Sequence, residues 1–141
     1  MSIQQMFLGA GAAPVSHVWS DYLTFDGGWA SSEDNTKAFD GSGTTGAAGD
    51  TGGTIEFRLP TGTTLTGTIG VSVSGTGTFP ATITWYVGTG GSRSVESVTV
   101  TAGHYIVEES DCTNFTGFDV ERTLSPVVYK VLLDDVDLED P

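Results

Sequence analysis

The segment that decides the fold runs from Trp29 to Pro60 and reads WASSEDNTKAFDGSGTTGAAGDTGGTIEFRLP. At its centre, the apolar pair Ala38-Phe39 stands directly before Asp40-Gly41, a dipeptide suited to a tight turn, because Asp bonds forward to the backbone and Gly adopts positive φ without strain. Residues 54–59 then alternate polar and apolar side chains until Pro60 ends the pattern. The segment predicts a long loop, pinned to the core by Phe39, that leads into a half-buried strand.

Further alternating segments flank this one on both sides and are separated by short turns rich in Gly. We expect strands over 17–25, 65–74, 81–87, 95–100, 104–108, 114–121 and 127–133, with a terminal hairpin over 127–138. Trp19, Leu23 and Trp85 fall at core positions of this pattern. The three residues Thr101-Ala102-Gly103 have hairpin spacing, and Asp135 stands where Gly is usual, which favours a longer terminal turn. The sequence predicts an all-β, antiparallel β-sandwich of about eight strands over residues 17–141, preceded by an N-terminal arm over residues 1–16; the resemblance described below makes this sandwich a jelly roll.

The chain of 141 residues suits one domain, and its net charge is -13 with a sequence pI near 4.1. Its five Lys and Arg side chains are scattered, so we predict no nucleic-acid partner. No apolar run is long enough for a membrane span, and no basic residue precedes the first apolar run, so we expect neither a membrane partner nor a signal peptide. Cys112 is the single cysteine and excludes an internal disulfide; with no His at motif spacing, we predict an inert thiol.

The arm combines Ile3, Met6, Phe7 and Leu8 with small residues and Pro14. Chain ends are often loose unless they dock, so one interpretation is a loose terminus. The other is an assembly arm whose four apolar side chains dock in a groove of a neighbouring subunit, because their burial removes apolar surface from water.

Ala30-Ser31-Ser32, Ala38-Phe39-Asp40-Gly41, Thr45 and the strand after it resemble the opening of discoidin-like (coagulation factor 5/8 type C) and related carbohydrate-binding domains, which are galactose-binding-type jelly rolls. Gly46 and Ala47 replace the tryptophan that follows the Thr in those families. The leader MSIQQMFLGAGAA resembles that of virion structural and appendage proteins of marine tailed phages, especially cyanophages. The end of the chain, Asp134 to Leu138, resembles the terminal hairpin of phage sandwich domains.

The discoidin-like resemblance implies two sites. A structural calcium would involve Asp40, Thr45 and Glu139, although a plain Asp turn is the alternative explanation for Asp40. A sugar would meet exposed aromatic side chains, for which we propose Trp29, Tyr86 and Tyr105; capping of the core is the alternative for Trp29. His17 and His104 stand in no nucleophile motif, so we predict no enzyme and no catalytic residue.

The sequence and the resemblances together predict a non-enzymatic phage virion structural protein, displayed as a head decoration or as a tail or fibre accessory. It would be made in the host cytoplasm, contact other capsid or tail proteins, and occur as a homo-oligomer or in many copies. A carbohydrate-binding module for adsorption to a host glycan is the alternative, and the two functions can coexist.

Overall fold

The computed structural model describes residues 17–26, 34–75, 78–87, 92–99 and 104–141, with the backbone alone for 92–98 and 104–113. The described chain is antiparallel β-structure with two one-turn 3-10 helices, so the all-β expectation is confirmed. The helices are η1 (Trp19–Tyr22) and η2 (Asn35–Ala38). The strands, which form one nine-stranded sheet, are β1 (Leu23–Asp26), β2 (Ala47–Ala48), β3 (Thr54–Arg58), β4 (Leu65–Ser74), β5 (Ala81–Val87), β6 (Ser92–Val98), β7 (His104–Arg122), β8 (Val127–Leu133) and β9 (Val136–Asp137).

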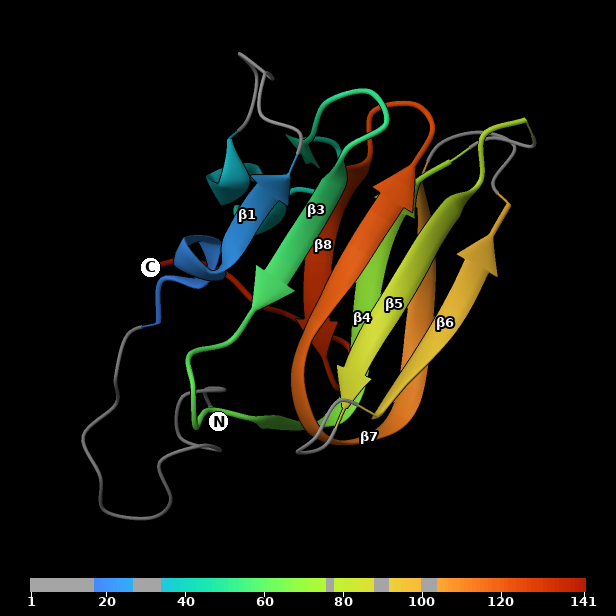
Figure 1. Ribbon diagram of the computed structural model, residues 1–141. Coiled ribbons are helices and arrows are strands. Elements are labelled where there is room, and N and C mark those ends of the chain that lie inside the picture. Colours follow the sequence, from blue (N-terminus) through green and yellow to red (C-terminus); the bar gives the residue numbers. More distant parts are fainter. Residues whose placement is uncertain (1–16, 27–33, 76–77, 88–91, 100–103) are drawn as a thin grey trace, which may run out of the picture.

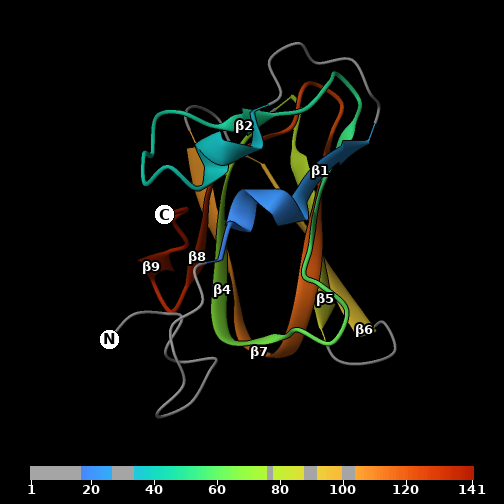
Figure 2. The same cartoon turned by 90° about the vertical axis from the view of Figure 1, so that its left-hand side faces the viewer.

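The sheet curls into two facing layers because strand β7 belongs to both (Figure 1). The first half of β7 pairs with β4, which pairs in turn with β8. The second half lies between β3 and β5. Figure 2 shows β7 passing from one layer to the other at the closed end, with η1 between the layers. Two register shifts in the β4–β7 ladder and the positive φ of 57° at Asn114 accompany this bend.

The space between the layers is filled by apolar side chains, with an aromatic cluster at its centre. Phe57 on β3 lies 5.2 Å from Phe118 and 6.0 Å from Phe39, measured between ring centroids. Trp85 on β5 packs 6.0 Å from Phe118. Trp19, Leu23, Phe39 and Trp85 are all buried, as the sequence predicts, and so are the odd-numbered apolar residues Leu65, Ile69, Val71 and Val73 of β4. Phe39 therefore pins the long loop to the core.

Three local expectations are wrong. Residues 19–22 form η1 and the strand begins only at Leu23, because one helical turn buries Trp19 and Ser20 together where a strand would alternate them. Residues on either side of 101–103 form no hairpin, since β6 pairs with β5 while the start of β7 pairs with β4. The segments 104–108 and 114–121 are one continuous strand, β7.

The hairpin between β8 and β9 is tighter than expected. Asp134 and Asp135 form a two-residue turn with φ of 51° and 64°, the left-handed conformation that Gly adopts most readily. The carboxylate of Asp134 accepts a hydrogen bond from the Thr68 backbone N–H at 2.9 Å, which ties the turn to β4. Lys130 and Asp137 form an ion pair across the two strands.

The C-terminal tail is hydrogen-bonded to the first described residues of the domain. Asp140 accepts hydrogen bonds from the backbone N–H groups of Trp19 (2.6 Å) and Ser20 (3.3 Å) and from the Ser20 hydroxyl (2.5 Å). Its own N–H donates to the Phe39 carbonyl at 2.9 Å. Leu138 is buried beside these contacts. The tail thereby links η1 to Phe39, the residue that follows η2, at the edge of the core.

Candidate functional site

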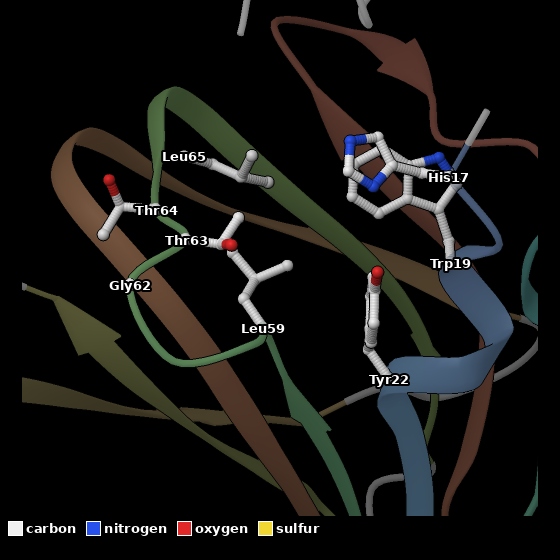
Figure 3. Close-up of a pocket in the computed structure, with 8 residues that line it drawn as sticks. All are labelled: His17, Trp19, Tyr22, Leu59, Gly62, Thr63, Thr64 and Leu65. Carbon is white, nitrogen blue, oxygen red and sulfur yellow. The ribbon is translucent and has the colours of Figure 1, made fainter. Parts of the chain in front are cut away.

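A groove of about 350 Å³ opens between η1 and the loop that joins β3 to β4 (Figure 3). The side chains of His17, Trp19 and Tyr22 form one wall. The residues that line the groove are His17, Trp19, Tyr22, Leu59, Gly62, Thr63, Thr64 and Leu65. The site thus joins two segments that lie about forty residues apart in the chain.

The aromatic wall of the groove is ordered by ring contacts. The His17 imidazole stacks on the Trp19 indole with ring centroids 4.7 Å apart. Tyr22 meets Trp19 edge-on at 6.4 Å and Phe57 in the core at 6.4 Å. Because Trp19 is only 3% exposed, the accessible surface of this wall belongs mainly to His17 and Tyr22, which are half-buried.

The opposite wall is a turn whose shape depends on one glycine. The Thr63 N–H donates to the Pro60 carbonyl at 2.9 Å, and Gly62 has φ of 85°, the positive value that the third position of a type II turn requires. Leu59 and Leu65, before and after this turn, are buried and give the groove an apolar floor. The Thr63 and Thr64 hydroxyls add hydrogen-bonding capacity at the rim.

A second polar site lies on the outer face of β3, β7 and β5. The Tyr86 hydroxyl donates to Asp119 Oδ2 at 2.5 Å, and Arg58 donates to Asp119 Oδ1 at 2.5 Å. The Arg58 guanidinium also lies over the Tyr86 ring at 4.3 Å, a favourable cation–π arrangement. Asp119 is 8% exposed, whereas the Arg58 side chain is 39% exposed. A buried carboxylate is thus neutralised by a cation that still reaches solvent.

Gly117 makes this outer-face site possible. It lies on β7 directly between Arg58 and Tyr86 in the strand register. A Cβ at this position would lie 2.1 Å from the Phe57 carbonyl oxygen and 3.2 Å from Arg58 Cδ. The absence of a side chain on the middle strand therefore lets Arg58 cross β7 and reach the Tyr86 ring.

The loop after Phe39 brings together the residues that the discoidin-like resemblance assigns to calcium. Asp40 accepts hydrogen bonds from the Ser42 N–H (2.7 Å) and the Thr45 hydroxyl (2.5 Å). The Glu139 carboxylate lies against Gly41, where an added Cβ would be 2.7 Å from Glu139 Oε1. Within the described residues, no group of three or more His, Cys, Asp or Glu side chains could hold a metal ion.

This loop does not fit a calcium site well. Calcium takes six to eight oxygen ligands, whereas both Asp40 oxygens already accept hydrogen bonds inside the loop. The contacts correspond to the alternative explanation, an Asp turn that bonds forward to its own backbone, with Thr45 completing the network.

Several predicted site residues lie outside the described part of the chain. These are the arm residues Ile3, Met6, Phe7 and Leu8 and the proposed sugar contact Trp29. Tyr105 pairs with Val73 through the β7 backbone, and its side chain is likewise outside the described part. Of the three proposed sugar contacts, Tyr86 is the one whose side-chain surroundings the structure describes.

The sequence pattern does not predict the groove. It predicts that Trp19 is buried, which the structure confirms, but it does not place the neighbouring His17 and Tyr22 on a shared surface. The available signal was three aromatic rings within six residues, His17 to Tyr22, followed later by the Gly-containing turn after Leu59. Only the fold reveals that these two segments face each other.

Comparison with protein-family models, with curated proteins and with solved structures found no match for this chain. In the part of the chain that the structure describes, no helix has the length and apolar character needed to cross a membrane.

Proposed function

We propose that this chain is a non-enzymatic structural protein of a tailed-phage virion, displayed as a head decoration or as a tail or fibre accessory and attached through residues 1–16. The observation that carries the proposal is the closure of the domain by its own C-terminal tail. The buried cluster extends from Trp19 to Leu138, and Asp140 holds the start of η1 against the end of the chain. The described residues between His17 and Pro141 thereby supply a core of their own, and the apolar arm would serve a partner.

The fold assignment that accompanies this function is a jelly-roll β-sandwich. Two facing layers with an aromatic core between them support the sandwich, and the passage of β7 from one layer to the other supports a rolled rather than a flat-stacked arrangement. Such a domain presents polar outer faces, and the net charge of -13 favours solubility at a particle surface. The protein would be made in the host cytoplasm without a signal peptide and assembled in several copies with other capsid or tail proteins.

The test uses virions of the phage that encodes the chain. Mass spectrometry of purified particles should detect the protein, and a triple change of Met6, Phe7 and Leu8 to Ser should abolish its incorporation while the soluble protein stays folded. A change of Gln4 and Gln5 to Ser in the same arm is the matched control and should incorporate normally. Absence of the protein from purified virions would refute the proposal.

The second candidate function is carbohydrate binding at a host surface, and the outer-face site around Tyr86 favours it. Arg58 and Tyr86 lie beside the half-buried Thr84 on the outer face of the sheet, and Asp119 beneath them accepts a hydrogen bond from each. Aromatic rings and charged hydrogen-bonding groups of this kind contact sugars. A glycan array should then show binding by the wild type that falls at least tenfold in Tyr86→Ala. Equal binding by the two proteins would show that Tyr86 is not part of the sugar site. A wild type that binds no glycan would refute the second candidate function.

A further inference from the structure

The groove between η1 and the β3–β4 loop is a neutral surface on a strongly acidic protein. The chain has 18 Asp and Glu residues, yet among the side chains that the structure describes no Asp, Glu, Lys or Arg lines the groove. Its floor is made by the buried side chains of Leu59 and Leu65. A neutral, apolar lining on a surface of net charge -13 selects an uncharged, apolar occupant.

The geometry of the aromatic wall favours an inserted side chain over a sugar ring. A sugar stacks on an open aromatic face, but Trp19 is 3% exposed and the His17 ring lies on it at 4.7 Å. What the groove offers is a pocket with apolar walls and the Thr63 hydroxyl at its edge (Figure 3). Its volume of about 350 Å³ suits a few apolar side chains.

The arm has the matching chemistry. Residues 1–16 contain no Asp, Glu, Lys, Arg or His, and Met6-Phe7-Leu8 is their most apolar run. The described chain begins at His17, which itself lines the groove. We infer that the groove is the receptor for Met6-Phe7-Leu8 of a second copy of this chain, an inference that rests on the attachment role proposed above for the arm.

The charge of the protein and the length of the segment between Leu8 and His17 suit an arm that is supplied by a second copy of the chain. Two bodies of net charge -13 repel each other, so a contact between copies is favoured where both surfaces are neutral. The eight residues from Gly9 to Ser16 extend over at most about 29 Å, which lets the acidic bodies remain separated while the arms cross. Reciprocal insertion of identical arms gives a closed two-fold pair, the exchange arrangement by which identical chains dimerise at low cost.

The experiment uses the full chain with the photoreactive residue p-benzoylphenylalanine in place of Phe7. Equal amounts of ¹⁵N-labelled and unlabelled protein are mixed in urea, refolded together so that the copies associate at random, irradiated and digested, and the crosslinked peptides are analysed by mass spectrometry. The expected result is crosslinks from position 7 to segments 17–22 and 59–65, with half of them joining a labelled to an unlabelled peptide. Crosslinks that join only peptides of the same label would mean that each arm binds its own body, and would overturn the inference, as would crosslinks mapped elsewhere or none.

Groove variants supply the independent check. Thr63→Trp fills the groove and should reduce the mixed-label crosslinks at least tenfold and convert the dimer to monomer in light scattering, and Thr63→Arg should do the same by placing a charge there. Thr61→Trp is the matched control, because Thr61 is an exposed residue of the same turn outside the groove lining, and should crosslink like the wild type. Unchanged crosslinking in both Thr63 variants would overturn the groove as receptor.

Particle incorporation separates this inference from the function on which it rests. If the Met6-Phe7-Leu8 variant loses incorporation while no crosslink to the groove forms, the arm binds a different virion protein, and only the inference fails. If the wild-type protein is absent from virions while mixed-label crosslinks form, the proposed function fails and the exchange of arms stands.

Discussion

Replacing Asp140 by Ala removes the contact that joins the two ends of the domain. The carboxylate accepts three hydrogen bonds, from the Trp19 and Ser20 backbone N–H groups and from the Ser20 hydroxyl, at 2.6, 3.3 and 2.5 Å. Trp19 and Ser20 are each 3% exposed, so these donors have little access to water once the carboxylate is gone. The change therefore creates unsatisfied polar groups in the wall of the core.

The expected loss follows from the number of donors left without a partner. An unsatisfied buried donor costs about 1–3 kcal/mol, and partial entry of water at this edge reduces the sum of three. We expect Asp140→Ala to lower the free energy of unfolding by about 3 kcal/mol, a large fraction of the stability of about 5–15 kcal/mol that is typical of a domain. With an unfolding entropy of about 0.3 kcal/mol/K for a chain of this length, the melting temperature should fall by about 10 °C.

Urea unfolding of the full chain, followed by tryptophan fluorescence, measures the effect. Asp140→Asn keeps an oxygen for the two backbone donors and should lose about 1 kcal/mol, an amount typical of one neutral hydrogen bond. Asp21→Ala, an exposed acid of the same 3-10 helix, is the control and should stay within about 0.5 kcal/mol of the wild type. If Asp140→Ala were no less stable than Asp21→Ala, the view that the tail closes the core would be wrong.

Three further changes test other parts of the structure. Ser72→Ala should raise the free energy of unfolding by about 1 kcal/mol, because the Ser72 hydroxyl is buried without a hydrogen-bond partner; Ser74→Ala is the control and should lower it, since the Ser74 hydroxyl accepts a bond from Arg122. Asp135→Gly should raise the free energy of unfolding by about 0.5–1 kcal/mol, because Gly adopts the positive φ of 64° without strain. A lower free energy of unfolding in urea would contradict the turn geometry. A thermal melt in calcium and then in chelator should give the same midpoint, because the Asp40 loop is closed by its own donors; a higher midpoint in calcium would restore the metal site.

Sequence patterns predicted the parts of the fold that depend on neighbouring residues. Alternation placed Ile83 and Trp85 of β5 in the core and left Thr82 and Thr84 on the other face. The apolar pair before Asp40 correctly predicted that Phe39 is buried. In each case the strand period of two or a local turn carried the information.

Pairing and long-range contacts were beyond these patterns. The spacing at 101–103 predicts a hairpin only if the two flanking strands pair with each other. In the structure each flanking strand has another partner: β6 pairs with β5, and the start of β7 pairs with β4. The sequence predicts two strands in place of the single strand β7, because the residues between Glu108 and Asn114 show no alternation of apolar and polar side chains. The groove depends on the approach of η1 to the β3–β4 loop, and the contact of Arg58 with Tyr86 depends on a glycine in a third strand.

The sharing of β7 between the layers has a consequence for how this protein can come apart. We expect neither layer to unfold while the other stays folded, because the backbone of β7 is hydrogen-bonded in both layers. Amide protons along β7 should consequently exchange with deuterium only when the whole molecule opens, and the domain should resist a mechanical load as one indivisible body.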